Sequence, residues 1–167
     1  GLTGDATLLG VDYRPRNGKL YGLGNQGGIY TISDRTAAAT KVGQLTVALA
    51  GTSFGVDFNP AADALRIISD AGQNLRVPFA GGETPGATAT DTSLTSPPAA
   101  GITTGVTGAG YTNNDADANT GTTLFDLDSM LDQAAIQSPA NSGQLVATGK
   151  HVIVLGDEPA PGCRRFD

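Results

Sequence analysis

The chain has 167 residues, of which 39% are hydrophobic, enough for one domain with a core of its own. Charged residues make up only 16%, and the net charge of -6 disfavours a nucleic-acid partner, because phosphate binding needs clustered lysine and arginine. No apolar run approaches the roughly 20 residues that a membrane-spanning helix requires, so no membrane span is expected.

Along the chain, the first predicted unit covers about residues 8–50. Four short apolar segments in it are separated by turn residues, which is typical of antiparallel strands. Asn17 and Gly18 predict a two-residue type I′ hairpin turn between the first two strands. Four strands in about 45 residues match the size of one propeller blade. We predict them at residues 8–13, 19–24, 29–33 and 39–45.

A second unit, at about residues 52–100, repeats the first 45 positions later without a gap. Tyr13 of the first copy becomes Phe58, and a fixed period of this kind indicates an array of similar units. The segment 83–101 is rich in threonine, proline, alanine and glycine, so the fourth strand of this unit is predicted to be weak. The residues shared by the two copies are Gly10, Val11, Asp12 and Pro15, which recur as Gly55, Val56, Asp57 and Pro60.

A third and fainter unit is predicted at about residues 106–149. It begins at Gly108, and Leu124 and Phe125 correspond to Leu20 and Tyr21 of the first copy. Residues 1–150 are therefore predicted to form one repeat domain, followed by an irregular C-terminal tail at 151–167.

Four stretches of this sequence together resemble a bacterial family, the domain-of-unknown-function family 4394, over about residues 2–150. They are LLGVDYRPRNGKLYGLGNQGGIYTI, GTSFGVDFNPAADALRIISDAGQNLR, AGYTNNDADANTGTTLFDLDS and IQSPANSGQL. The resemblance implies an exported protein with β-propeller-like repeats, and it brings no established activity or catalytic residue set.

The predicted fold is thus all-β, a β-propeller-like array of about three four-stranded antiparallel sheets. Three sheets leave a ring open, and exposed sheet edges attract partners. We expect two chains to pair as a homodimer that completes the ring, the alternative being a fourth small sheet built from the tail. The single cysteine, Cys163, excludes an intrachain disulfide and fits either a cytosolic or a secreted protein. A secreted, extracellular protein is expected from the acidic composition, the scarcity of lysine, the absence of tryptophan and the abundance of threonine, glycine and alanine.

Asp12 and Asp57 are candidate site residues, because they occupy the same place in two repeats. The structural interpretation is that each carboxylate accepts backbone N–H bonds in the turn that follows. The functional interpretation is a ring of carboxylates near the axis that holds a cation.

The insertion in the third unit is a candidate calcium site. It places Asp115, Asp117 and Asn119 on alternate residues, and Asp126 lies where an EF-hand loop has its bidentate ligand. No helices are predicted at its flanks, so an EF-hand is not expected. A calcium site on a hairpin loop and a solvated acidic turn both remain open.

Two function classes fit these observations. The first is a secreted repeat scaffold that binds a ligand or partner, since repeat surfaces commonly serve binding. The second is an extracellular hydrolase with paired carboxylates, assisted by calcium. Convergence of Asp12, Asp57 and a third acid in one pocket would favour the hydrolase; dispersal into separate turns would favour the scaffold.

Overall fold

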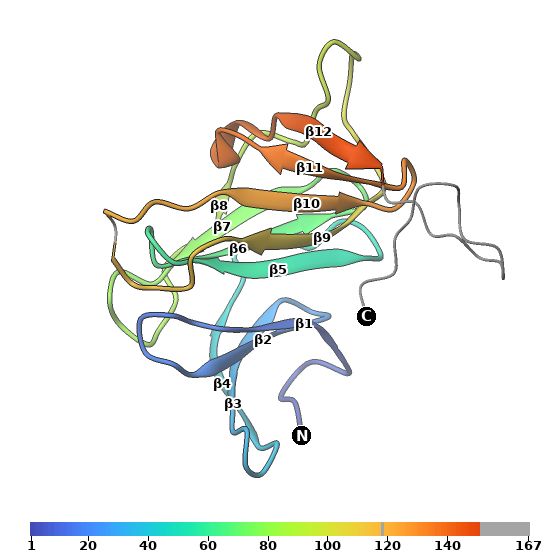
Figure 1. Ribbon diagram of the computed structural model, residues 1–167. Coiled ribbons are helices and arrows are strands. Elements are labelled where there is room, and N and C mark those ends of the chain that lie inside the picture. The colour runs from blue at the N-terminus through green and yellow to red at the C-terminus, as the bar shows by residue number, and fades with distance from the viewer. Residues whose placement is uncertain (118, 151–167) are drawn as a thin grey trace, which may run out of the picture.

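The computed structural model describes residues 1–117 and 119–150 and consists of three four-stranded antiparallel sheets (Figure 1). The predicted tail, with His151 and Cys163, lies outside the described residues. Sheet 1 contains β1 (Leu8–Tyr13), β2 (Leu20–Gly24), β3 (Gly28–Ile32) and β4 (Ala39–Gln44). Sheet 2 contains β5 (Phe54–Asn59), β6 (Ala64–Ser69), β7 (Asn74–Pro78) and β8 (Ala89–Thr90). Sheet 3 contains β9 (Val106–Tyr111), β10 (Leu124–Asp128), β11 (Gln133–Gln137) and β12 (Leu145–Lys150).

The all-β prediction is confirmed. Each sheet follows chain order, and the one helix among the described residues is a 3₁₀ turn, η1 (Ala140–Ser142). The weak fourth strand predicted for the second unit is β8, which has only two residues. None of the helices in the described ranges could cross a membrane.

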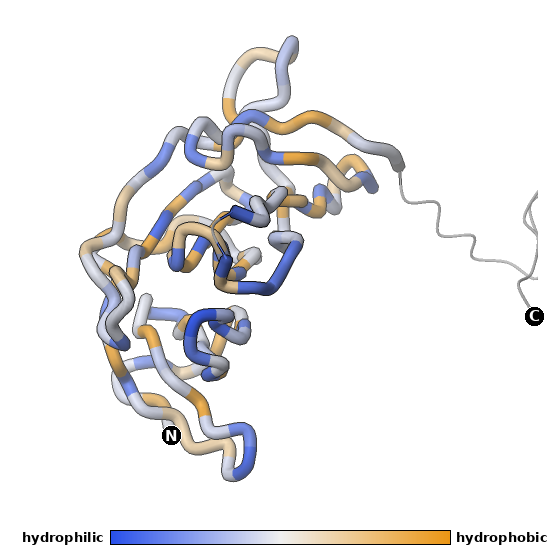
Figure 2. Tube along the Cα trace, turned by 60° about the vertical axis from the view of Figure 1, so that its left-hand side comes forward, coloured by the Kyte–Doolittle hydropathy of each residue, from blue (hydrophilic) through white to orange (hydrophobic). Residues whose placement is uncertain are grey.

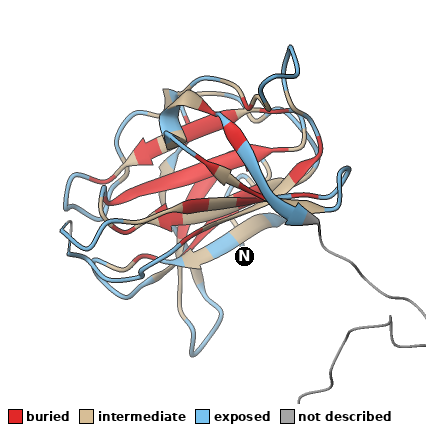
Figure 3. Cartoon of the chain, turned by 45° about the horizontal axis from the view of Figure 1, so that its top comes forward, coloured by how far each residue is buried: buried red, intermediate tan, exposed pale blue. Residues whose placement is uncertain are grey.

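The first strands of the sheets, β1, β5 and β9, lie side by side, because β5 contacts both of the others (Figure 1). The three sheets form an open array, with sheet 2 between sheets 1 and 3. Hydrophobic and hydrophilic segments alternate along the chain (Figure 2). The buried residues gather in the strands, while most turns are exposed (Figure 3).

The predicted type I′ turn at Asn17–Gly18 is wrong. The N–H of Arg14 donates to the carbonyl of Lys19, so the connection from β1 to β2 is longer and this hydrogen bond encloses four residues, 15–18. Gly18 has a positive φ of 65°, whereas Asn17 is not among the residues with positive φ. A type I′ turn needs positive φ at both central residues. Pro15 fixes a negative φ at the start of this loop and so favours the longer connection.

Residues of the inner strands alternate between two faces, and the pattern repeats. Gly10 lies against Val56 of sheet 2, and Gly55 lies against the backbone of β9 in sheet 3. A Cβ at Gly55 would approach within 2.5 Å of the backbone nitrogen of Ala109, so glycine permits this close approach of two sheets.

The two junctions between sheets differ in the size of their apolar clusters. The junction of sheets 1 and 2 contains the larger cluster, with the rings of Tyr21, Phe58 and Phe79 at mutual centroid distances of 5.3 Å. The junction of sheets 2 and 3 has a smaller apolar cluster, which includes Ile68 and Leu94.

The repeat places Tyr13 and Phe58 at equivalent positions, yet Phe58 is fully buried and Tyr13 is 50% exposed. Phe58 packs against sheet 1, whereas Tyr13 is on the face of sheet 1 that points away from sheet 2. No described sheet covers that face.

Candidate functional site

Asp12 and Asp57 link each sheet to the next through the inner strands. Asp12 Oδ2 accepts a hydrogen bond from the backbone N–H of Phe58 at 2.8 Å, and Asp57 Oδ2 accepts one from that of Tyr111 at 2.7 Å. Asp12 Oδ1 also accepts the N–H of Tyr13 at 2.7 Å. The carboxylates therefore do bind backbone N–H groups, but mainly in the neighbouring sheet rather than in the turn that follows.

The two carboxyl groups are half-buried and interact with each other. Burial raises the pKa of Asp57 to about 7, and repulsion from the Asp12 carboxylate adds to this effect. Burial also raises the pKa of Asp12, against the N–H groups of Phe58 and Tyr13, which lower it. The third repeat has Gly110 at the corresponding place, paired with Phe125 as Asp12 is paired with Tyr21. The repeats thus supply two carboxylates to this region.

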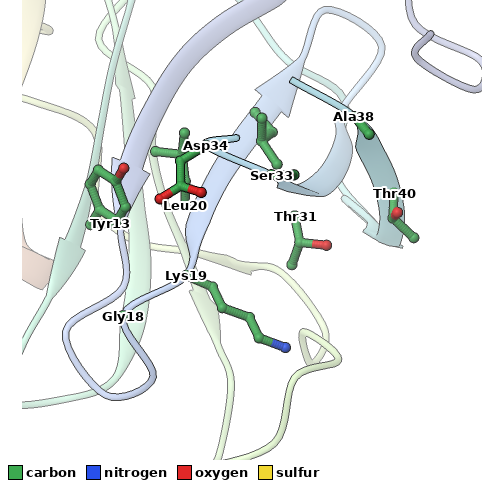
Figure 4. A pocket seen from close by; sticks show the side chains of 10 residues that line it. Tyr13, Gly18, Lys19, Leu20, Thr31, Ser33, Asp34, Ala38 and Thr40 are labelled. Carbon is green, nitrogen blue, oxygen red and sulfur yellow. The ribbon is translucent and has the colours of Figure 1, made fainter. Parts of the chain in front are cut away.

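A hollow of about 370 Å³ lies on sheet 1 (Figure 4). Tyr13, Leu20 and Ile32 contribute apolar surface, and the charged side chains of Lys19 and Asp34 lie at the turns beside it. The remaining residues that line it are Gly18, Thr31, Ser33, Ala38 and Thr40.

The repeat explains why this space is hollow. The matching positions of sheet 2, 45 residues later, are Phe58, Leu65, Val77 and Phe79, and all four are buried. There the ring of Phe79 fills the space beside Phe58. Asp34 occupies the position of Phe79 in sheet 1 and is exposed, so its short carboxylate leaves the space open.

The acidic loop places three of its predicted ligands together and the fourth elsewhere. Asp115, Asp117 and Asn119 are exposed, and Asp117 Oδ1 accepts the backbone N–H of Asn119 at 2.9 Å. Asp126 instead lies in the middle of β10, fully buried. Among residues 1–117 and 119–150, no group of three or more His, Cys, Asp or Glu side chains could hold a metal ion. Calcium binding by the loop alone stays a prediction.

Both side-chain oxygens of Asp126 are buried without a hydrogen-bond donor among the described residues. Burial raises the pKa of this carboxyl to about 7, although the nearby charge of Arg66 opposes the shift. Gln137 Oε1, on the neighbouring strand, is also buried without a donor in the described chain.

Arg66 organises the rest of that junction. Its guanidinium donates to Asn74 Oδ1 at 2.8 Å and to Asp91 Oδ2 at 2.7 Å within sheet 2 and the segment that follows it. It also reaches Tyr111 Oη at 3.2 Å and Asn141 Oδ1 at 2.7 Å in the third repeat. The sequence analysis missed this arginine. The available signal was a charged residue inside the apolar strand ALRIIS, where the first repeat has Tyr21.

A second buried ion pair joins sheets 1 and 2. The Arg14 guanidinium donates to both oxygens of Asp63, at 2.6 Å and 2.5 Å, and stacks 4.5 Å from the ring of Phe79. Burial disfavours the ionised Asp63, yet the hydrogen bonds and charge of Arg14 hold its pKa below the usual value. Such bidentate pairs between planar groups fix geometry as well as charge.

The fold and these junctions define a class of protein: an all-β repeat protein with propeller-like sheets joined through their inner strands. Within that class, the chain belongs to the family described as domain of unknown function (DUF4394), whose model matches residues 1–160. No curated protein matches the chain in sequence.

Two solved structures are similar in fold. An auxiliary nutrient binding protein from Bacteroides thetaiotaomicron VPI-5482 is 17% identical, with a TM-score of 0.57 over 84% of this chain. An auxiliary nutrient binding protein from Bacteroides ovatus ATCC 8483 is 16% identical, with a TM-score of 0.58 over 86% of this chain. The chain spans about a third of each, 35% and 36% of their lengths.

Proposed function

We propose that this protein is an extracellular scaffold that binds a small polyhydroxylated ligand in the hollow on sheet 1. The observation that carries the proposal is the replacement of a buried Phe79 by Asp34, which opens the hollow beside Tyr13. Its volume of about 370 Å³ is in the range of small-molecule sites. The likeness to nutrient binding proteins supports a binding role.

The lining suits a ligand with hydroxyl groups. The ring of Tyr13 and the side chains of Leu20 and Ile32 offer an apolar surface to C–H groups. Asp34 offers an acceptor at its rim, whereas the ammonium of Lys19 is paired with Glu83. A few polar groups around an apolar floor are the usual composition of such a site.

Isothermal titration calorimetry with a panel of neutral mono- and disaccharides and polyols tests the proposal. We expect at least one member to bind the wild-type chain and Asp34→Asn or Tyr13→Ala to weaken that binding by at least tenfold. Asp115→Asn, in the exposed loop, is the matched control and should leave it unchanged. Absence of binding across the panel, or equal binding by Asp34→Asn, would overturn the assignment of this hollow.

Binding is favoured over the alternative of a hydrolase with paired carboxylates. Both oxygens of Asp12 and one oxygen of Asp57 accept backbone N–H groups, and the third repeat supplies glycine instead of an acid. Export is part of the proposal, supported by the acidic composition. Fractionation of cells that express the native gene, with this protein detected in the culture medium, tests it.

A further inference from the structure

Asp5 inserts its carboxylate into a cradle formed by the turn between β2 and β3 and the start of β3. One oxygen accepts the backbone N–H of Gln26, and the other lies 2.6 Å from the hydroxyl of Tyr30. A Cβ at Gly24 or at Gly28 would collide with this carboxylate, so the two glycines provide the space that it fills. We call these four residues of sheet 1, Gly24, Gln26, Gly28 and Tyr30, the cradle.

The cradle favours a charged carboxylate over a neutral group. Burial raises the pKa of Asp5, but hydrogen bonds from Tyr30 and from two backbone N–H groups, together with the charge of Lys41, hold this pKa below its usual value. Tyr30 is fully buried, and burial together with the Asp5 carboxylate raises its pKa to about 12. The hydroxyl therefore keeps its proton, which it shares between Asp5 and the carbonyl of Thr3 at 2.7 Å.

The matching turn of sheet 2, 45 residues later, carries side chains where the cradle has glycines. There Gln73 binds the preceding segment with its own amide group. Its Oε1 accepts the N–H of Ala50 at 3.0 Å, and its Nε2 donates to the carbonyl of Ala48 at 2.9 Å. The carboxylate, the two glycines and the hydroxyl thus change together, which indicates that they form one unit. The residues that match Asp5, Gly24, Gly28 and Tyr30 are Ala50, Ser69, Gln73 and Leu75.

We propose that the turn between β2 and β3 is a carboxylate-binding site, which Asp5 of the same chain occupies in this structure. The cradle offers a donor to each oxygen of a planar carboxylate, and backbone N–H groups of turns are well suited to bind anions. Asp5 is tethered beside the site, so its effective concentration exceeds that of a free carboxylate. Residues 1–7 therefore act as a built-in competitor for this site. The cradle and the hollow are built from different residues, so this proposal is independent of the proposed function.

Chemical rescue tests the site. Asp5→Gly removes the carboxylate, so the variant should unfold at a lower temperature than the wild type. About 100 mM sodium acetate should raise its melting temperature by about 3 °C or more relative to sodium chloride at the same concentration, because acetate binds the folded state. Acetamide, a neutral molecule of similar shape, should have no such effect. The wild type should respond equally to acetate and chloride, because Asp5 already fills the cradle.

Gly24→Ala in the Asp5→Gly background is the matched steric control. The atoms nearest to a Cβ at Gly24 are those of the Asp5 carboxyl group, so the methyl group takes the space that acetate would use. This double variant should fold and should lose the response to acetate. Amide NMR spectra locate the binding: acetate should shift the N–H resonance of Gln26 in Asp5→Gly and leave it unchanged in the double variant.

Three results would overturn the proposal: equal melting temperatures of Asp5→Gly in acetate and chloride, an equal response to acetamide, or an equal response of the double variant. Should Asp5→Gly fail to fold by circular dichroism, Asp5→Asn tests the same charge preference. Because the pKa of Asp5 is lowered, its carboxylate stabilises the fold above the ordinary value of 3.8, and this contribution is lost as pH falls below that value. The melting temperature of Asp5→Asn should therefore lie below that of the wild type at pH 7 and approach it in acid. A constant difference at both pH values would exclude a site selective for the charged carboxylate.

Discussion

Asp126→Asn should make the protein more stable above neutral pH. The carboxyl of Asp126 is fully buried, and neither oxygen has a donor in the described chain. Its pKa is about 7 in the folded protein, against 3.8 for the ordinary group. This difference in pKa between the folded and the unfolded chain corresponds to about 4 kcal/mol of unfolding free energy.

Whether stability rises or falls with pH depends on whether the folded or the unfolded chain binds the proton of Asp126 more tightly. The raised pKa means that the folded protein holds this proton when the unfolded chain has released it. The contribution of Asp126 to stability is therefore largest below pH 3.8, falls as pH rises from about 3.8 to 7, and is constant above. Asparagine carries no charge, so the advantage of the variant should grow from near zero at pH 4 to as much as about 4 kcal/mol at pH 8.

Urea unfolding of both proteins at pH 4, 6 and 8 measures this difference. Asp57 titrates in the same range, with a pKa of about 7, but its contribution cancels when variant and wild type are compared. Asp115→Asn, at an exposed position, is the control and should follow the wild type. Equal stability differences at pH 4 and pH 8 would refute the reasoning, because Asp126 would then be ionised and compensated. A stabilised variant would also argue against Asp126 as a calcium ligand.

Three further predictions concern the aromatic side chains of the repeat, a buried ion pair and the acidic loop. Phe58→Ala should lower the free energy of unfolding by roughly 3–5 kcal/mol, the cost of truncating a buried aromatic residue, whereas Tyr13→Ala, at a half-exposed residue, should cost much less; thermal unfolding of the two variants decides. Asp63→Asn should lower the free energy of unfolding by about 3–5 kcal/mol, because it leaves the Arg14 guanidinium buried without its anion. Urea unfolding at neutral pH measures this, and coinciding curves for variant and wild type would contradict it. If the acidic loop binds calcium, the melting temperature should be higher in calcium than in EDTA, because a hundredfold excess of calcium over Kd stabilises the folded protein by about 2.7 kcal/mol. The double variant Asp115→Ala with Asp117→Ala should abolish this difference. Identical melting curves for both proteins in both buffers would show that the loop is a solvated turn.

The sequence predicted the sheets well because the repeat carries their pattern. Apolar segments recur 45 residues apart, and the matching cross-strand pairs, Asp12 with Tyr21 and Asp57 with Arg66, have the register that the alignment implies. The N–H bonding of the two carboxylates was also predictable in kind. Which N–H groups the two carboxylates bind was not predictable, because the local sequence does not show whether a donor lies in the following turn or in the neighbouring sheet.

The candidate site was harder to predict, because its features depend on which face of a sheet is covered. Tyr13 and Phe58 are equivalent in sequence, yet only Phe58 has a sheet against it. Asp34 was not predicted to be a site residue, because aspartate is common in turns. Its role becomes visible only when its position is compared with that of Phe79 in sheet 2. The spacing of Asp126 from Asp115 predicted a calcium ligand in the loop. Asp126 lies in β10 instead, where the alternation of side chains along the strand directs it into the junction of sheets 2 and 3.

The carboxylate bonds between sheets also make individual amide protons reporters of separate opening events. The amide protons of Phe58 and Tyr111 are bound by groups of the preceding sheet, so each can exchange with solvent only when its junction opens. The amide proton of Tyr13 is bound within its own sheet. Exchange rates at these three positions would therefore give three separate quantities in one experiment: the opening free energy of the junction of sheets 1 and 2, that of the junction of sheets 2 and 3, and that of local fraying of β1.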